Sequence, residues 1–348
     1  MKYILQHYSK YPQMQLQDFV KLLYQANFGC EHIFSDKMVG YIDSEMQQCQ
    51  CSSAPLFEQI RDEYCRVDLC AYKALGGTSQ TLGKCMRNVH ASGTKQDLCN
   101  QLDQLLLLIK EGTIGLDYHQ AVEQIEWYKQ QDCPAIHHSQ LYRDSYQPHY
   151  RVVYTKQAML LTAMVQIEGK LTQGKPIVVG MDGPCGSGKS TLAQVLSQHL
   201  SCPIIHADHF FLPPELRTMQ RIQAGQNLHW EALLPVIQQA KQGKDFVYQV
   251  YNCQTNSYVD KQFNAASCTI VEGSYSLVEP LRHLYDVTIL LQIDADKQLQ
   301  RLTKRQGNIE QFVNKWIVYE QYHLDKLPPC DIVIDTNVEA LWEIWNKN

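Results

Sequence analysis

The sequence has few of the features that mark membrane proteins, fibrous proteins or proteins that bind nucleic acid. Charged residues make up only 19% of the 348 residues and the formal net charge is −5, so no basic excess is available to neutralise a polyanion. The longest apolar run, residues 105–109, is far shorter than the ~20 residues that a membrane-spanning helix needs. We therefore expect no nucleic-acid partner and no membrane partner.

Low counts of glycine and proline, 18 and 13, leave little room for long disordered linkers. Residues 1–15 contain no continuous apolar segment of the kind found in signal peptides, so we expect a cytoplasmic protein. The 13 cysteines are scattered without paired C-x-x-C spacing, which favours reduced thiols. Cys49 and Cys51 form the closest pair, but one intervening residue is an uncommon spacing for zinc ligands, so we expect packed or solvated thiols there.

The length predicts roughly two domains, because a domain commonly has about 150 residues. Before residue 170 the apolar residues recur at helical spacing, and strand-like alternation is scarce. We predict a mainly α-helical domain of unknown role over residues 1–150, followed by a connecting helix over 151–174. The expected helices cover residues 16–28, 95–112, 117–128 and about 152–171.

After residue 175 the pattern changes to short β-branched runs that alternate with helical segments. Such alternation is typical of a parallel sheet covered by helices on both faces, so we predict an α/β domain over residues 175–348. The expected strands cover residues 177–181, 203–206, 246–251, 269–271, 287–293 and 332–334.

A phosphate-binding loop follows the first of these strands. The pattern G-x-x-x-x-G-K-S places Gly183, Gly188, Lys189 and Ser190 at the required positions, and residues 191–200 leave the loop with helical periodicity. Glycines let backbone N–H groups approach phosphates closely, and the helix N-terminus adds partial positive charge. The predicted nucleotide-binding residues are Gly183, Pro184, Cys185, Gly186, Ser187, Gly188, Lys189, Ser190 and Thr191.

The loop predicts ATP and Mg²⁺ as cofactors. Lys189 is expected to reach the β and γ phosphates, and the Ser190 hydroxyl to ligate the Mg²⁺ that bridges them. Cys185 lies inside the loop, where a positive field would favour a reactive thiolate, but a small loop filler is the simpler role.

Among proteins with this loop, a small-molecule kinase fits the sequence. The guanine-reading N-K-x-D motif and the transporter signature L-S-G-G-Q are both missing from the sequence. Asp208 follows the second strand and is expected at the carboxyl edge of the sheet, where open α/β sheets bind ligands. We predict that Asp208 takes the proton of a substrate hydroxyl.

About half of the chain resembles the superfamily of uridine kinase, phosphoribulokinase and pantothenate kinase. The resemblance is carried by GPCGSGKST in the loop, HADHFF after the second strand, V-E-G at residues 271–273, R-L-T-K-R at 301–305 and D-I-V-I-D at 331–335. It implies a mostly parallel five-stranded sheet, with Asp208 as general base and Mg²⁺ ligand and Glu272 as a further Mg²⁺ ligand. It also implies that Arg301 and Arg305 act with Lys189 in catalysis, as lid cations on the transferred phosphoryl group.

Two segments depart from the uridine kinase pattern. The lid continues with Gln306 where a further R-G-R stretch is usual, and residues 251–258 read YNCQTNSY where the family resembles Y-D-F-x-T-H-S-R. A site built to hydrogen-bond one polar group discriminates strongly, so uridine is not expected to be the preferred acceptor. The predicted acceptor-binding residues are Asp208, Phe210, Tyr251, Thr255 and Asn256.

The leading hypothesis is therefore an ATP-dependent kinase that phosphorylates a hydroxyl of a nucleoside, sugar or related metabolite. The alternative is a regulatory ATP-binding module whose N-terminal domain binds a partner. Retention of Asp208 favours the kinase, because an ATP sensor needs no hydroxyl base. A homo-oligomer remains open. The histidines at 137, 138 and 149, and the pair at residues 31–32, fit either a binding surface or structural packing. The N-terminal half also resembles extensions of bacterial uridine kinase-like proteins.

Overall fold

The computed structural model divides into two compact units, Met1–Ala158 and Met159–Asn348. It describes residues 1–30, 37–50, 54–61, 63–87, 89–223, 227–252, 255–306, 309–310 and 312–337. The division falls inside helix α9 (Thr155–Leu171), and the predicted domain limits at residues 150 and 175 stay predictions. In this described part of the chain, no helix combines the length and apolar character needed to cross a membrane.

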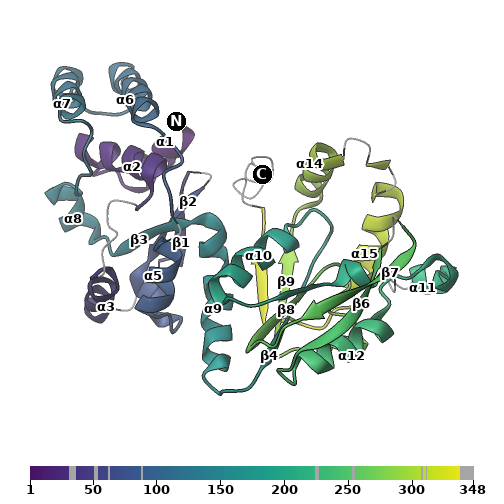
Figure 1. Ribbon diagram of the computed structural model, residues 1–348. Coiled ribbons are helices and arrows are strands. Elements are labelled where there is room, and N and C mark those ends of the chain that lie inside the picture. Colours follow the sequence, from purple (N-terminus) through teal and green to yellow (C-terminus); the bar gives the residue numbers. More distant parts are fainter. Residues whose placement is uncertain are drawn as a thin grey trace. The chain divides into compact units, whose positions relative to one another are not determined.

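The N-terminal unit is mainly helical, as the apolar spacing predicts (Figure 1). Helix α2 buries Phe19 and Leu23 completely, and its first turn is closed by a capping box between Gln15 and Asp18. Gly29, with φ +58°, ends this helix at the predicted place. The helices of the unit are α1 (Lys2–Lys10), α2 (Leu16–Phe28), α3 (Met38–Gln48), α4 (Leu69–Ala74), α5 (Ser79–Arg87), α6 (Lys95–Lys110), α7 (Tyr118–Gln130) and α8 (Gln140–Tyr146).

A small antiparallel sheet, which the sequence did not predict, lies among these helices. Its strands β1 (Phe57–Arg61), β2 (Tyr64–Asp68) and β3 (Tyr150–Tyr154) pair in the order β1-β2-β3. Strand β2 shows no alternation because even Arg66 is buried, at 5% exposure. The helix expected from residue 152 begins only at Thr155, since the residues before it belong to β3.

The C-terminal unit contains the predicted parallel sheet of five strands, in the order β10-β9-β4-β8-β5. Every neighbouring pair is parallel. All residues of the central strands β4 and β8 are buried, as expected for a sheet covered on both faces. The strands are β4 (Ile177–Asp182), β5 (Ile204–His206), β8 (Cys268–Glu272), β9 (Val287–Gln292) and β10 (Ile332–Asp335).

The strand predicted at residues 246–251 exists but does not join this sheet. Strand β6 (Phe246–Asn252) pairs with β7 (Ser257–Phe263) in a separate antiparallel hairpin. The burial of β7 shows why, because most of its residues are exposed and such a strand cannot lie inside a covered sheet. Asn256, with φ +50°, lies at the turn of the hairpin.

Helices lie on both faces of the sheet and leave one edge for the functional site (Figure 1). Helix α12 packs Leu233 and Ile237 into a core with Val271, while α10 contacts β4, β5 and β8. The loops after β4, β5 and β8 emerge at the same edge, because these strands are parallel. The helices are α10 (Lys189–Leu200), α11 (Met219–Gln223), α12 (Trp230–Ala240), α13 (Glu279–Arg282), α14 (Ala295–Gln306) and α15 (Ile317–Leu324).

Candidate active site

The phosphate loop joins β4 to α10 through backbone that requires glycine. Gly183 has φ +150°, and a Cβ there would approach the Leu291 carbonyl oxygen to 2.7 Å. Gly188 has φ +96° and is the N-cap of α10, so the first amides of the helix point into the loop. The glycine spacing of the sequence motif is thus a steric requirement of this turn.

Lys189 lies over the loop that it is expected to serve. Its ammonium donates to the carbonyl oxygens of Gly183 at 2.8 Å and Pro184 at 3.0 Å, and its side chain is buried. These contacts hold the cation next to the loop amides. The two positive features that phosphates need, an ammonium and a row of N–H groups, are therefore assembled in one place.

A buried carboxylate that the sequence analysis missed holds the start of the loop. Asp182 accepts hydrogen bonds from the N–H groups of Gly183, Tyr275 and Leu277 at 2.7, 3.1 and 2.9 Å, and from His323 Nε2 at 2.9 Å. Burial alone would raise the pKa of Asp182, but His323 and the backbone donors outweigh burial and lower it. Asp182 therefore ties three separate segments together as an ionised group.

Ser190 and Glu272 meet at the edge of the sheet as the resemblance implies. The Ser190 hydroxyl donates to Glu272 Oε2 at 3.2 Å, and His206 Nδ1 lies 2.5 Å from Glu272 Oε1. His206 and Glu272 are register partners on β5 and β8, a neighbour relation that the sequence alone does not give. A hydroxyl beside carboxylates is a set of hard oxygen ligands, which suits Mg²⁺.

Asp208 follows β5 and faces the same pocket. The V-E-G glycine permits this approach, because a Cβ on Gly273 would meet Ala207 Cβ at 2.7 Å and Asp208 Oδ1 at 3.3 Å. Burial by the pocket wall raises the pKa of Asp208, Lys189 opposes the rise, and Glu272 adds to it. The carboxylate itself is exposed to the pocket, so a substrate could reach it.

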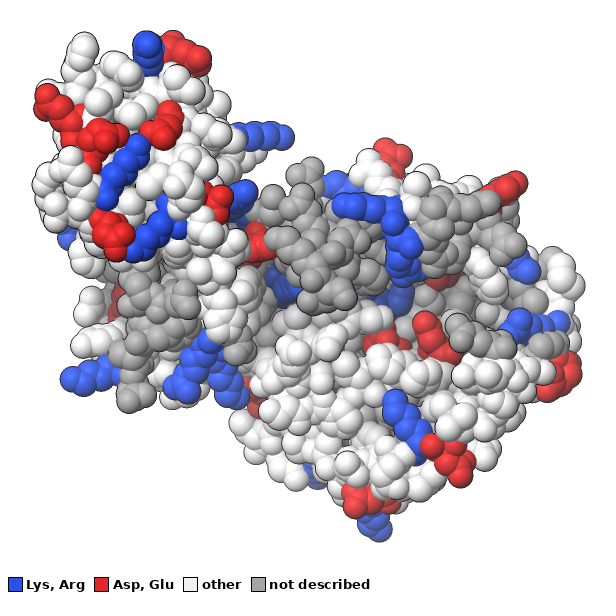
Figure 2. Space-filling model, turned by 45° about the horizontal axis from the view of Figure 1, so that its top comes forward, with Lys and Arg blue, Asp and Glu red and all other residues white. Residues whose placement is uncertain are grey.

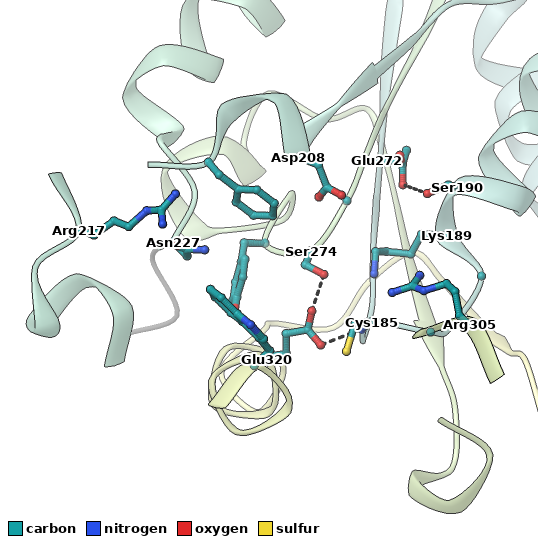
Figure 3. A pocket seen from close by; sticks show the side chains of 16 residues that line it. Cys185, Lys189, Ser190, Asp208, Arg217, Asn227, Glu272, Ser274, Arg305 and Glu320 are labelled. Carbon is teal, nitrogen blue, oxygen red and sulfur yellow. Dashed lines mark hydrogen bonds between the residues drawn. The ribbon is translucent and has the colours of Figure 1, made fainter. Parts of the chain in front are cut away.

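Lys189, Ser190, Asp208 and Glu272 line one pocket of about 450 Å³. In the view of Figure 3, Lys189, Ser190 and Arg305 lie on one side, Arg217 and Asn227 on the other, and Asp208 between them. The Asn227 side chain is 6% exposed, and its Oδ1 has no hydrogen-bond partner in the described structure. The pocket thus has a phosphate side and a second polar side. Phe211 and Trp316 add aromatic walls.

The two predicted lid arginines lie in different surroundings. Arg305 lines the pocket, as expected of a cation that contacts a phosphoryl group. Arg301 is instead buried, donating to the Gly186 carbonyl at 3.3 Å and the Thr336 carbonyl at 2.5 Å. Arg301 therefore fastens the phosphate loop to the end of β10, a positioning role rather than that of a mobile cation.

The predicted acceptor-binding segment does not line this pocket. Phe210 is buried and stacks on Tyr248 in the core, so the neighbouring Phe211 lines the pocket in its place. Tyr251 is buried and its hydroxyl donates to Asn256 at the end of the β6–β7 hairpin. Thr255 contacts only its own turn in the recorded hydrogen bonds, through the Asn252 and Ser257 side chains.

Helix α15 contributes a carboxylate to the pocket that no local sequence pattern marks. Glu320 accepts a hydrogen bond from the Cys185 N–H at 2.7 Å and from the Ser274 hydroxyl at 2.6 Å (Figure 3). Burial, with the nearby Glu320 carboxylate, raises the pKa of the Cys185 thiol to about 12. A raised pKa disfavours the thiolate, which favours the simpler of the two expected roles of Cys185, a small filler of the loop.

Some expected features lie outside the described residues, namely Cys51, the Glu31-His32 pair and the lid residues 307–308. Within the described ranges, no three His, Cys, Asp or Glu residues gather into a metal-binding group. On the face shown in Figure 2, cationic and anionic side chains are interspersed. Among the described residues of this face, no broad basic area resembles a nucleic-acid surface.

Comparison with known proteins places the similarity in the C-terminal half. The dephospho-CoA kinase family matches residues 177–341. A uridine kinase from Schizosaccharomyces pombe is 28% identical over 182 residues, which cover 45% of this chain and 39% of that protein. A uridine kinase from Brevibacillus brevis is 26% identical over 182 residues, covering 46% of this chain and 85% of that protein.

A solved structure described as a possible uridine kinase from Bacillus stearothermophilus is 20% identical, with a TM-score of 0.38. It covers 50% of this chain and 99% of that protein. The chain thus spans about two fifths of the S. pombe relative and most of the two bacterial ones. The C-terminal half of the chain therefore has the fold of a P-loop kinase domain, and its sequence resembles those of uridine kinases.

Proposed function

We propose that the chain is an ATP-dependent kinase that transfers the γ-phosphoryl group to a hydroxyl of a small molecule. The observation that carries this proposal is the position of Asp208, which lines the same pocket as Lys189, Ser190 and Glu272. A protein that only senses ATP could use such a carboxylate as a Mg²⁺ ligand but needs no base for a substrate hydroxyl, which is the role that we assign to Asp208. Nucleosides, sugars and related metabolites offer suitable hydroxyl groups.

In the proposed reaction the acceptor hydroxyl lies between Asp208 and the γ-phosphorus. Asp208 takes the hydroxyl proton, the oxygen forms a bond to phosphorus, and the bond to the β-γ bridging oxygen breaks to release ADP. Lys189 and Arg305 neutralise the charge that develops on the phosphoryl oxygens. Little covalent work by the protein is required, because the transfer depends mainly on positioning and charge.

Mg²⁺, when bound with ATP, would neutralise charge on the β and γ phosphates. Ser190, Glu272 and Asp208 are the residues that would hold it, directly or through water, since Mg²⁺ keeps several waters in most phosphate sites. The hydrogen bonds of Glu272 with Ser190 and His206 hold the Ser190 and Glu272 oxygens in place before any metal binds.

The second side of the pocket supports a polar acceptor. Asn227 presents a buried Oδ1 without a partner in the described structure, and Arg217 presents a guanidinium on the same side. A ligand that donates to Asn227 would satisfy this oxygen. We propose that these residues, with Phe211, read the acceptor, and that uridine is not the preferred one, because residues 251–258 depart from the uridine kinase pattern and do not line this pocket.

The proposal is tested by measuring acceptor-dependent ADP formation over a panel of nucleosides, sugars and dephospho-CoA. The dephospho-CoA arm is included because that family matches the C-terminal half. At least one acceptor should stimulate ADP formation, and Asp208→Asn should reduce that rate by ~10²- to 10⁴-fold with a smaller change in ATP affinity. Asp260→Asn, an exposed site on β7, is the matched control and should keep the parent rate.

Three outcomes would each contradict one part of this proposal. ATP binding without acceptor-dependent ADP formation across the panel would favour the alternative, a regulatory module whose N-terminal unit binds a partner. An Asp208→Asn variant as fast as the parent would remove Asp208 as the base. A kcat/KM for uridine above those of all other acceptors would show that the Tyr251–Tyr258 segment was misinterpreted.

A further inference from the structure

A second pocket, of about 470 Å³, lies wholly within the Met1–Ala158 unit. Its wall is formed by side chains from α2, α3, α8 and β3 and from the segment before α8. It is as large as the pocket of the C-terminal unit, and sizes of this order suit a small metabolite. Nothing in the kinase proposal uses it.

The back wall of this pocket is a fixed polar network. Asp18 is fully buried and accepts from His138 Nδ1 at 2.8 Å and from the Ser139 N–H and hydroxyl at 3.0 and 2.6 Å. An ionised carboxylate only accepts, so His138 carries its proton on Nδ1 and accepts through Nε2 from the Tyr150 hydroxyl at 2.6 Å. The donors and acceptors of this wall are thus paired before a ligand binds.

A buried cation lies behind that wall. Arg66 donates to Gln25 Oε1 at 3.2 and 2.9 Å, and its guanidinium lies 4.6 Å from the Tyr150 ring centroid. Glu58 is its nearest recorded carboxylate, at 3.6 Å. Gln25 and Tyr150 line the pocket, so Arg66 adds positive potential through a thin layer of side chains.

Two further cations line the pocket itself. Lys21 is half-buried and donates to the Ile136 carbonyl at 2.9 Å, while Arg143 is exposed at the rim. The described structure records no ion pair for either side chain. Burial, and then Arg66, lower the pKa of Lys21 to about 8, and the buried Asp18 carboxylate offsets only part of this shift.

The remaining charges of the pocket compensate one another. Glu45, a carboxylate in the pocket lining, binds Arg151 at 2.6 Å and His149 Nδ1 at 3.1 Å. This arrangement leaves Lys21 and Arg143 as the cations available to a ligand. An anion placed between these two cations would offset the loss of hydration that burial imposes on the Lys21 ammonium.

We propose that this pocket binds a small metabolite with an oxyanion group, a phosphate or a carboxylate, held by Lys21 and Arg143 against the His138–Tyr150 wall. Arg143 offers a planar fork that matches either oxyanion, and Lys21 offers a point charge. The site would be separate from the ATP site, because its lining lies entirely in the other unit.

The test uses the full chain carrying Lys189→Ala, which weakens phosphate binding at the phosphate loop. Titration calorimetry with inorganic phosphate and with malonate should give saturable binding of one of them. Lys21→Met and Arg143→Gln should each weaken that binding tenfold or more, because each removes a charge-assisted contact. Lys110→Met, which removes an exposed cation at the end of α6, is the matched control and should change nothing.

The two arms identify the oxyanion, since saturation by phosphate alone indicates a phosphorylated metabolite and saturation by malonate alone a carboxylate. Arg143→Glu covers the risk that a variant at Lys21 unfolds, because Arg143 is exposed and its charge reversal should abolish binding in a folded protein. The proposal is overturned if neither anion binds with a Kd below about 10 mM. Equal weakening by Lys110→Met would overturn it too, as a general charge effect.

Discussion

The pocket of the Met159–Asn348 unit and the pocket of the Met1–Ala158 unit differ in how the chain forms them. Most of the pocket of the Met159–Asn348 unit is lined by segments that leave three parallel strands, and the backbone of one of these segments forms the phosphate loop before Lys189 and Ser190. The pocket of the Met1–Ala158 unit consists of side chains brought from distant positions, such as Lys21 and Tyr150. A backbone site constrains residue types at fixed spacing, whereas a side-chain site does not. The first is therefore visible in a sequence, and the second emerges only from the fold.

Replacing Lys189 should inactivate the pocket of the Met159–Asn348 unit and leave ligand binding in the pocket of the Met1–Ala158 unit unchanged. Lys189→Ala removes the ammonium that neutralises the phosphates, so acceptor-dependent turnover should fall by ~10³-fold or more. Oxyanion binding in the N-terminal unit should be unchanged. Turnover assays and calorimetry on the same preparation measure both effects.

The reciprocal variant is Lys21→Met, which should weaken oxyanion binding and leave the binding of ATP at the phosphate loop unchanged. Parent-like turnover in Lys189→Ala would contradict the assignment of the phosphate loop. Loss of oxyanion binding in Lys189→Ala would mean that the phosphate loop, and not the N-terminal pocket, binds the anion.

The pH dependence of turnover tests the electrostatic environment of Asp208. Asp208 accepts a proton only when ionised, and burial raises its pKa above the usual carboxylate value. As the pH falls, kcat/KM should therefore begin to decline at a higher pH than an ordinary aspartate would give, and then drop about tenfold per pH unit. A pH profile of kcat/KM with a good acceptor measures this.

The identity of the titrating group is checked with Glu272→Gln. Glu272 contributes to the raised pKa of Asp208, so its neutralisation should shift the acid limb to lower pH, alongside a weaker response to Mg²⁺. An acid limb at the position of an ordinary carboxylate in the parent enzyme would argue that Asp208 is not the base.

Glu320 tests how far the phosphate loop depends on side chains from outside its motif. Glu320→Gln replaces a carboxylate that accepts from the Cys185 N–H with a neutral amide, which should cost about 1–2 kcal/mol in loop ordering. We expect KM for ATP to rise about tenfold, as such a cost implies, with a smaller effect on kcat. Glu279→Gln, at the exposed start of α13, is the control. Unchanged KM would reduce Glu320 to a packing residue.

The parts of the structure that can be predicted from the sequence are those in which the spacing of residue types follows from local steric and packing requirements. The phosphate loop, its flanking strand and helix, and Asp208 follow from steric and topological rules that act within a few residues. The five-stranded parallel sheet follows from alternation of elements along the chain. Helix α2 follows from its apolar period and its terminal glycine.

The parts that were missed depend on contacts between distant residues. Strand β2 was not recognised because the burial of Arg66 removes the alternation that marks a strand. Strand β6 was assigned to the sheet because its composition is that of a core strand, while its partner β7 decides its place. Glu320 reaches the loop from a helix far along the chain, and no local pattern marks it.

We expect the stability of the Met1–Ala158 unit around its pocket to fall slightly in acid. Burial lowers the pKa of His138 to about 4, although Asp18 opposes the shift, and burial also lowers the pKa of His7 to about 4. Between that value and the unfolded value of about 6.5, the unfolded chain binds more protons than the folded chain. The stabilisation is therefore complete above pH 6.5 and is lost as the pH falls towards 4.

Each of these two imidazoles should lower the free energy of local opening by about 0.5–1 kcal/mol when the pH falls from 7 to 6. Peptide-resolved hydrogen exchange, corrected for the intrinsic pH dependence of exchange, should localise the His138 share of the loss to peptides around α2, α8 and β3, and the His7 share to peptides around α1 and β1. His138→Gln should remove the part of the pH dependence that the His138 imidazole contributes. His137→Gln, which replaces an exposed neighbour, should retain the full pH dependence. Identical pH dependence in both variants would show that the buried network does not make the pocket acid-sensitive, and that its wall is held by packing alone.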